Sequence, residues 1–291
     1  MDFIPDESKE SNGLIQLLKL LAFSLLSAVC FSLLAIFLVY IIYGTIEPKN
    51  LGSMRIMLVA TSLGLFLVPS LILPISEKSS ITTFYGFKKV KPNLLLLTIL
   101  LIVVSMPFLE WTVAVNEKMV LPDALKWVED WMRQKEEETK TVTLMLLDMK
   151  NISDLIVNLL MIAVIPAIAE ELIFRGALQR SLTKIFHNPH VAIWMTAFIF
   201  SAIHFQFFGF LPRFLMGAAF GYLYFWSGSL WYAMIAHFLN NAYAVCIAWY
   251  MQKNNIPLSE ADQMHFTWYG YVLSFMLAIL IFQVFKKQTN K

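Results

Sequence analysis

The stretch Ile165-Pro-Ala-Ile-Ala-Glu-Glu-Leu-Ile-Phe-Arg-Gly176 decides how the rest of the chain is interpreted. It continues an apolar run that begins near residue 152 and that is typical of a membrane-spanning helix. Within six residues it carries Glu170, Glu171 and Arg175. An ionisable group near the middle of a bilayer costs about 2.5 to 3.5 kcal/mol on insertion scales. We therefore expect these groups to face protein or a watery cavity.

Helical spacing separates the three charged groups into two roles. Glu171 and Arg175 are four residues apart, so they lie on one face and can form an ion pair. Glu170 lies about 100° away around the helix and lacks that partner. This pattern favours Glu171 and Arg175 as a pair that orders the site, and Glu170 as the reactive acid. The alternative is a charged helix end that snorkels to the headgroups, or a structural ion cluster.

Composition places the chain among polytopic α-helical membrane proteins. Of its 291 residues, 58% are hydrophobic and only 14% are charged, which no ordinary soluble domain of this length shows. Long apolar runs without alternation indicate helices and not barrel strands. A net charge of +2 gives no reason to expect a nucleic-acid partner. Cys30 and Cys246 lie in apolar runs, so we expect free, buried thiols.

The apolar runs predict an all-α membrane bundle of about eight transmembrane helices. Pro69 and Pro74 are expected to kink or end the second span, and Gly217 and Gly221 are a weak signal of close helix packing. The predicted organisation is 1–150 for N-terminal membrane helices with an interfacial segment, 151–250 for a catalytic four-helix core, and 251–291 for a C-terminal span. The predicted spans are 14–43, 56–75, 94–111, 152–182, 191–207, 208–226, 230–250 and 269–285.

The segment 116–150 is too charged to be a span, yet its apolar residues recur at helical spacing. Pro122 and Asp123 make a plausible helix start. The pattern predicts an amphipathic helix in the membrane interface, with Trp127 and Trp131 near the headgroups. The alternative is a soluble cap over the mouth of the bundle.

Lys and Arg in the short loops predict the orientation of the bundle. The segments on the side of the N-terminus hold more of them than the opposite loops do. Because such residues concentrate on the cytoplasmic side, we expect both termini in the cytoplasm and the segment 116–150 outside.

Three further polar residues lie within predicted spans: His204 in the fifth, and His237 and Asn241 in the seventh. At about 1.5 Å rise per residue, all three lie within one or two helical turns of the depth of Glu170. His237 and Asn241 are four apart and share a face. We therefore expect a carboxylate, two imidazoles and an amide to converge in one pocket.

This set of groups suits hydrolysis of a peptide bond. Glu170 can take a proton from water, and His204 can orient the same water or protonate the leaving amine. His237 and Asn241 can donate hydrogen bonds to the oxyanion of the tetrahedral intermediate. No His-Glu-x-x-His motif is present. Glu170, His204 and His237 could nevertheless hold zinc, so a metal-dependent alternative stays open.

The motifs Glu170-Glu171-x-x-x-Arg175, Phe200-x-x-x-His204 and His237-x-x-x-Asn241 resemble those of the CAAX prenyl protease and bacteriocin-processing family, also called the Abi family. The stretch Gly228-Ser229-Leu230-Trp231 also fits a sequence pattern that is common in that family. The resemblance implies an active intramembrane endopeptidase without a bound cofactor, in which Glu170 and His204 activate water and His237 with Asn241 form the oxyanion hole. It implies that Glu171 and Arg175 order the site.

The resemblance also implies a location and a kind of partner. We expect an integral protein of the bacterial inner (cytoplasmic) membrane, acting within the lipid bilayer on a membrane protein or peptide. Two other classes of function stay open. One is a non-proteolytic scaffold or peptide-binding immunity or secretion factor, and the other is a transporter with Glu170 as proton carrier. A transporter would favour two pseudo-symmetric halves, which the sequence lacks.

Overall fold

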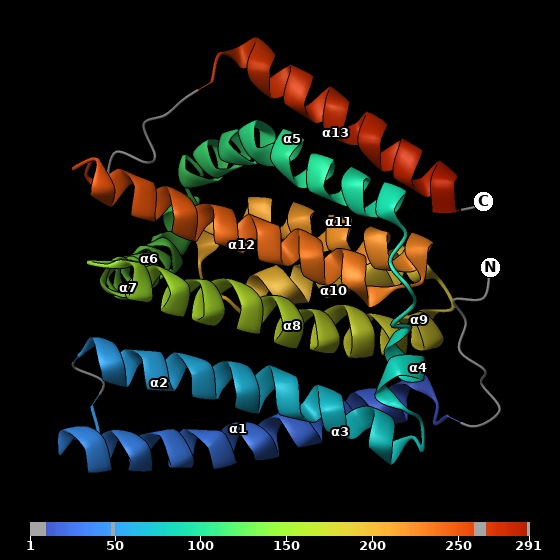
Figure 1. Cartoon of the computed structure of the whole chain (residues 1–291), viewed down its shortest axis with the longest axis horizontal. Helices are drawn as coiled ribbons and strands as arrows, with labels where there is room; N and C mark the ends of the chain where they lie inside the picture. Colours follow the sequence, from blue (N-terminus) through green and yellow to red (C-terminus); the bar gives the residue numbers. More distant parts are fainter. Residues whose placement is uncertain (1–9, 48–49, 259–265, 290–291) are drawn as a thin grey trace.

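The structure is a computed structural model that describes residues 10–47, 50–258 and 266–289. These residues form helices and connecting turns, with no strand among them. Figure 1 shows the long helices running side by side, with α1 and α2 at one edge and α5 and α13 at the opposite edge. The predicted all-α membrane bundle is therefore confirmed.

The first half of the chain builds one edge of the bundle and a surface helix. The rod from Leu51 to Ser76 is continuous, because α2 passes through a π-helical turn into α3. The elements are α1 (Gly13–Tyr43), α2 (Leu51–Thr61), η1 (Ser62–Leu67), α3 (Val68–Ser76), α4 (Ile81–Tyr85), α5 (Pro92–Glu117), η2 (Asp123–Leu125) and α6 (Lys126–Leu146).

The second half contains the central rod and the helices around it. A continuous helix of 35 residues, Ile152–Phe186, carries the Glu-Glu stretch near its middle. Its parts are α7 (Ile152–Asn158), η3 (Leu159–Val164), α8 (Ile165–Glu171), η4 (Leu172–Gln179) and α9 (Arg180–Phe186). The others are α10 (Pro189–Ala202), η5 (Phe207–Gly209), α11 (Phe210–Ser227), α12 (Leu230–Lys253) and α13 (Trp268–Thr289).

Five of the described helices are long and apolar enough to cross a membrane: Gly13–Tyr43, Leu51–Ser76, Pro92–Glu117, Ile152–Phe186 and Trp268–Thr289. The other three predicted spans correspond to α10, α11 and α12, of which α10 is a shorter apolar helix. In Figure 1 these three lie in the middle of the bundle. Because neighbouring protein surrounds them, they need less apolar surface than a helix that faces lipid.

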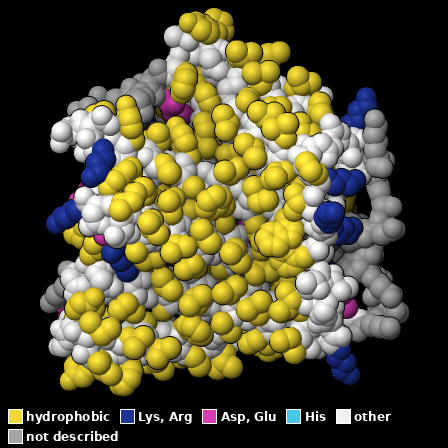
Figure 2. Space-filling model, viewed as in Figure 1, with side chains coloured by type: hydrophobic (Ala, Val, Ile, Leu, Met, Phe, Trp, Pro, Cys, Tyr) yellow, Lys and Arg dark blue, Asp and Glu magenta, His cyan; other side chains and the backbone are white. Residues whose placement is uncertain are grey.

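The outer surface of the bundle matches a membrane environment. Figure 2 shows hydrophobic side chains across the middle of one face, with Lys and Arg side chains toward its two ends. Cys30 and Cys246 are free but exposed on this kind of surface, so the prediction of buried thiols is wrong. Lipid tails are as apolar as a protein interior, so an apolar run in a membrane protein can face either of them. The start of α1 and the end of α13 lie at the same end of the bundle (Figure 1).

Two prolines each follow a π-helical turn. Pro69 comes two residues after η1, and Pro166 comes two residues after η3. A proline lacks the N–H that an α-helix needs and crowds the carbonyl four residues earlier. A local widening of the helix accommodates this without a break. Pro69 therefore does not end the second span, whereas the helix that contains Pro74 ends at Ser76.

The amphipathic segment forms α6, which begins close to the predicted Pro122-Asp123 start. It packs on the turn that follows α10: the rings of Trp131 and Phe207 lie 5.3 Å apart, and the Arg133 guanidinium lies 4.7 Å from the Phe208 ring centroid. Trp127 is 73% exposed, so the helix also presents apolar surface outward. The contacts place α6 against the bundle, and the interfacial location of the helix stays a prediction.

Candidate active site

The Glu171–Arg175 pair lies fully buried in the central rod. Arg175 Nη1 donates to Glu171 Oε1 at 2.5 Å, as the four-residue spacing predicts. Arg175 Nη2 donates to the carbonyl of Gly217 in α11 at 3.1 Å. Both side chains are 0% exposed, so each charge depends on its partner.

His237 of α12 lies between the two acids. Its Nδ1 contacts Glu171 Oε1 at 2.8 Å, and its Nε2 lies 3.9 Å from Glu170 Oε2. Glu170 is 9% exposed and His237 5% exposed, so both face the interior of the bundle. The contact between His237 and Glu171 was not predicted, because no sequence spacing links two separate helices.

An aromatic enclosure surrounds these polar groups. The Arg175 guanidinium lies 4.4 Å from the Phe200 ring centroid and 5.4 Å from that of Phe220. The ring of Phe220 stacks on His237 at 5.5 Å. Phe200 contacts the ring of His237 at 6.0 Å and that of His204 at 5.0 Å. Aromatic faces stabilise nearby cations, here the Arg175 guanidinium.

The sequence predicted His204 inside the fifth span, but the structure places it beyond the end of that helix. The helix α10 ends at Ala202, and His204 lies in the turn that follows, where Phe205 has a φ of 51°. The apolar residues that follow Ala202 hid this end from sequence reasoning. His204 Nδ1 contacts the Phe200 carbonyl at 2.7 Å. Because a carbonyl only accepts, Nδ1 carries the proton and caps the helix end, which leaves Nε2 as the open nitrogen.

The turn that carries His204 is fixed by a buried amide. Asn116, at the end of α5, donates through Nδ2 to the Phe207 carbonyl at 3.0 Å. Its Oδ1 accepts from the Leu211 N–H at 2.7 Å. Arg213 Nη2 adds a bond to Gln206 Oε1 at 2.6 Å. These contacts position the turn beside Phe200, where His204 and His237 contact the same ring.

Asn241 is one helical turn from His237 in α12, as predicted. Its side-chain amide also makes a contact that the sequence did not predict. Nδ2 donates to the Ile162 carbonyl at 3.0 Å, and Oδ1 accepts from Asn240 at 3.1 Å. The Ile162 carbonyl lies four residues before Pro166, which has no N–H to offer it. The Asn241 side chain therefore joins α12 to the central rod and retains one further N–H.

Two side-chain hydrogen bonds join the central rod to α11. Arg175 and Gln179 lie one turn apart, and they donate to the carbonyls of Gly217 and Gly221, also one turn apart, at 3.1 and 3.2 Å. A Cβ on Gly221 would lie 2.7 Å from Gln179 Oε1 and 2.9 Å from Ile193 Cγ2. The glycine pair thus admits close packing around the buried arginine, which its spacing signalled only weakly.

The proposed zinc ligands do not form a complete set in this geometry. Within the part of the chain that the structure describes, no three His, Cys, Asp or Glu side chains are placed to hold one ion. Glu170 Oε2 lies 3.9 Å from His237 Nε2, but no third His, Cys, Asp or Glu side chain among the described residues joins them. We therefore derive no catalytic step through a metal ion.

The comparisons with known proteins concern this same part of the chain. Residues 152–243 match the family described as type II CAAX prenyl endopeptidase Rce1-like. A protein of Bacillus subtilis (strain 168), the uncharacterized protein YpbD, is 33% identical over 93 residues. The match covers 31% of this chain and 44% of the relative, so the chain spans less than half of that relative's length. No solved structure matches.

The predicted family resemblance is confirmed for this segment. Residues 152–243 contain all six of the predicted site residues, from Glu170 to Asn241, and the structure places them on the central rod, on α12 and on the turn after α10. The five apolar helices and the match together support an integral membrane protein in which residues 152–243 are similar to type II CAAX prenyl endopeptidases.

Proposed function

We propose that the protein is an intramembrane endopeptidase that hydrolyses a peptide bond of a membrane-associated protein or peptide. The observation that carries the proposal is the placement of Glu170 Oε2 at 3.9 Å from His237 Nε2, beside a buried Glu171–Arg175 pair. A structural ion cluster would need no second carboxylate facing an open imidazole nitrogen. The family match over 152–243 supports the same reaction class.

In the proposed reaction Glu170 takes a proton from a water molecule, which attacks the carbonyl carbon of the scissile amide. His204, through its open Nε2, accepts a hydrogen bond from that water or relays the proton that Glu170 has taken up to the leaving amine as the C–N bond breaks. His237 and the free N–H of Asn241 donate to the oxyanion that forms.

Glu171 and Arg175 have a positioning role in this proposal. Glu171 holds His237 through Nδ1, so that Nε2 faces Glu170. Arg175 keeps the Glu171 carboxylate in place and is itself fixed by the Gly217 carbonyl. Preorganised donors and charges of this kind cost no reorganisation when charge develops in the transition state.

The test compares membranes of one host that expresses either the wild type or Glu170→Gln, followed by labelling of newly formed peptide N-termini. We expect new termini in the wild type that fall by about 10²- to 10⁴-fold in the variant, because the general base is lost. Glu137→Gln is the matched control, since Glu137 is exposed on α6 and the chemical change is the same.

Two outcomes would contradict the proposal. Equal sets of termini for the wild type and Glu170→Gln would favour a peptide-binding scaffold. Activity that a chelator abolishes and added zinc restores, with zinc found by elemental analysis of the purified protein, would replace the glutamate mechanism by a metal-dependent one.

A further inference from the structure

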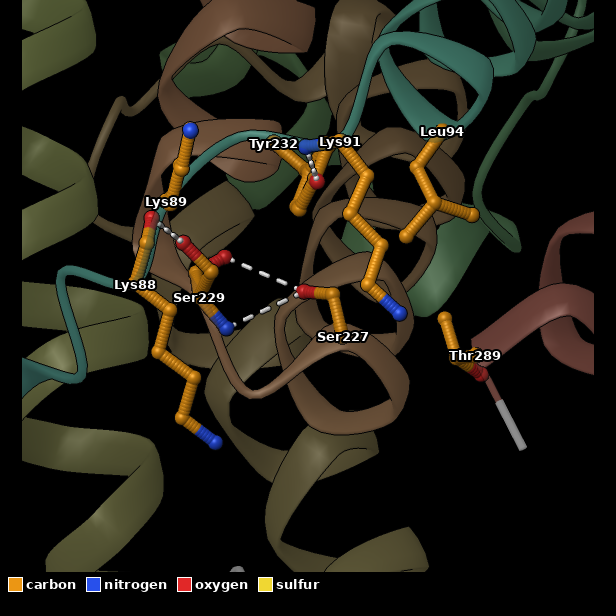
Figure 3. A pocket seen from close by; sticks show the side chains of 8 residues that line it. All are labelled: Lys88, Lys89, Lys91, Leu94, Ser227, Ser229, Tyr232 and Thr289. Atoms are coloured by element: carbon orange, nitrogen blue, oxygen red, sulfur yellow. Dashed lines mark hydrogen bonds between the residues drawn. The ribbon is translucent and has the colours of Figure 1, made fainter. Parts of the chain in front are cut away.

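A basic pocket lies at the end of the bundle where α5 and α12 begin and α13 ends. Its volume is about 70 Å³, enough for a small oxyanion. Figure 3 shows Lys91 reaching across it toward Ser227, while Lys88 and Lys89 lie on the opposite rim and extend away from it. Ser229 and Tyr232 contribute hydroxyl groups to the lining. The proposed protease reaction uses none of these residues.

Contacts between two loops build this pocket in advance. Gly86 and Gly228 both have positive φ angles, 66° and 61°, and a Cβ on Gly86 would lie 2.7 Å from the Gly228 carbonyl oxygen. Ser229 Oγ donates to the Lys88 carbonyl at 3.2 Å. The Lys91 N–H donates to the Tyr232 hydroxyl at 2.8 Å. The lysine-bearing loop is therefore fixed on the turn between α11 and α12.

Among the described residues, no acidic group compensates the positive charge of the pocket. No acidic residue lines it, and among the described residues none forms an ion pair with Lys88, Lys89 or Lys91. Two long helices also begin here, with Lys91 and Ser229 at their N-caps, and neither N-cap side chain caps its helix. The free N–H groups of helix N-termini add partial positive charge.

A buried hydroxyl supplies an independent indication of a ligand. Tyr232 is 2% exposed and its oxygen accepts from Lys91, yet no acceptor for its own O–H lies among the described residues. Phenolic hydroxyls at buried positions usually donate to a partner. An acceptor oxygen bound in the pocket would complete the hydrogen bonding of Tyr232.

The pocket lies where lipid headgroups would be. The long helices α5 and α12 enter the apolar bundle at this point. Trp226 and Trp231 are the sequence neighbours of the lining residues Ser227 and Tyr232. The ring of Trp231 lies 5.0 Å from that of Phe87, and Lys286 Nζ lies 5.4 Å from the Trp226 ring centroid. Tryptophan and lysine gather at the level of the membrane–water interface.

We infer that this pocket binds the phosphate of an anionic phospholipid headgroup. Lysine ammonium groups act as point charges that suit a tetrahedral phosphate, whereas a planar carboxylate favours the arginine fork. The ammonium of Lys91 and the O–H of Tyr232 contact the phosphate, and Lys88 and Lys89 turn inward from the rim by rotation of their long side chains. Binding joins the α4–α5 loop, the start of α12 and the end of α13.

The test uses the full chain, purified in detergent, and native mass spectrometry with added phosphatidylglycerol, phosphatidylcholine or inorganic phosphate. The variant Lys88→Gln/Lys89→Gln/Lys91→Gln is compared with Lys118→Gln/Lys140→Gln/Lys150→Gln. The control makes the same charge change at exposed lysines outside the pocket. We expect the pocket variant to bind phosphatidylglycerol at least about tenfold more weakly, because it loses three lysines. Each lysine near the membrane surface adds to the electrostatic attraction of an anionic lipid.

Tyr232→Phe provides a second variant that keeps the charge and removes the buried hydroxyl. We expect it to lower the affinity for phosphatidylglycerol and to leave binding of phosphatidylcholine unchanged. Equal affinities in the pocket variant, the control and the wild type would overturn the inference. So would binding of inorganic phosphate without phosphatidylglycerol, which would assign the pocket to a soluble ligand. None of these measurements depends on proteolysis.

Discussion

Arg175 is the residue on which the geometry of the site depends. It is fully buried, and it contacts Glu171, the Gly217 carbonyl and the faces of two phenylalanines. Removing one member of a buried ion pair leaves an uncompensated charge, which typically costs about 3–5 kcal/mol. Replacing both members by apolar residues of similar size is often close to neutral.

We therefore predict that Glu171→Leu destabilises the protein by about 3–5 kcal/mol, measured by denaturant unfolding in detergent. The double variant Glu171→Leu/Arg175→Met is expected to recover most of that loss but none of the activity, because His237 then lacks the carboxylate that orients it. A double variant as unstable as the single one would show that the pair contributes through packing and not through charge.

A second prediction concerns Asn241. Asn241→Ala is expected to lower kcat by about 10²- to 10³-fold with a small change in KM, the usual effect of losing one oxyanion donor. It also removes the hydrogen bond to Ile162, so unfolding free energy should fall by about 1–3 kcal/mol. A loss of stability with unchanged kcat would leave Asn241 with a structural role only.

How much of the site could be predicted depended on whether the contact was local. The Glu171–Arg175 bond follows from a four-residue spacing within one helix, and so does the shared face of His237 and Asn241. The contacts of Glu171 with His237 and of Asn241 with Ile162 join separate helices. No single-sequence pattern specifies them, because they depend on how the helices rotate against each other.

At the scale of elements, the central rod departs from regular α-helix in two π-helical segments, η3 and η4, which lie on either side of α8. Pro166 explains η3, since it removes the N–H that would bond the Ile162 carbonyl.

Because Asn241 donates to that same carbonyl, we predict that Pro166 and Asn241 are energetically coupled. In a Pro166→Ala background the new N–H can bond Ile162, so Asn241→Ala should cost less stability than in the wild type, by about 0.5–3 kcal/mol. Additive effects in the double-mutant cycle, measured by unfolding, would contradict this.

The close contact of α11 with its neighbours gives a second prediction at this scale. Gly221→Ala should destabilise the protein by about 1–3 kcal/mol, because its Cβ would approach Gln179 and Ile193 to less than 3 Å. Gly270→Ala in α13 is the control, since nothing lies nearer than 3.4 Å there. That change should be neutral or slightly stabilising, as expected from helix propensity. Equal thermal shifts for the two variants would contradict the packing argument.

Element boundaries were predictable where a breaker or a charge cluster ended an apolar run. The first and last spans agree with α1 and α13 within one or a few residues at each end. The end of α10 was not predictable, because Ile203, Phe205 and Phe207 continue the apolar run beyond it. The turn there depends on contacts from Asn116, which lies about ninety positions earlier in the chain.

At the scale of the whole molecule, composition alone indicated a polytopic helical membrane protein, and the bundle confirms it. The number of spans was harder to predict from hydrophobicity than the class of protein was. Helices at the centre of a bundle face other helices, so they can carry polar side chains. The polar side chains that make α12 less apolar are those of the site, His237 and Asn241 among them. The cytoplasmic location of both termini stays a prediction, which cysteine accessibility labelling at each side would test.

A polar network at one end joins the start of α1 to α3 and α9. Glu77 is buried and accepts hydrogen bonds from Lys19 at 2.6 Å, from the Ser11 backbone at 2.7 Å and from Gln16 at 3.2 Å. Glu10 contacts Lys184 at 2.6 Å and Arg180 at 3.3 Å. These carboxylates connect the first helix with helices more than fifty positions later in the chain.

The Glu77 carboxylate makes this connection sensitive to acid. Burial raises its pKa, but the hydrogen bonds from Lys19, Ser11 and Gln16 outweigh that effect and lower the pKa from 4.5 to about 2. A carboxyl group with a lowered folded-state pKa stabilises the fold fully above its unfolded value. We therefore predict that this contribution is present above pH 4.5 and is lost as the pH falls toward 2.

Thermal unfolding in detergent across that range should show wild type and Glu77→Gln converging at low pH, with the variant less stable at neutral pH. Glu137→Gln, an exposed change on α6, should follow the wild type throughout. Parallel curves for wild type and Glu77→Gln would show that the network at this end of the bundle holds without the charge.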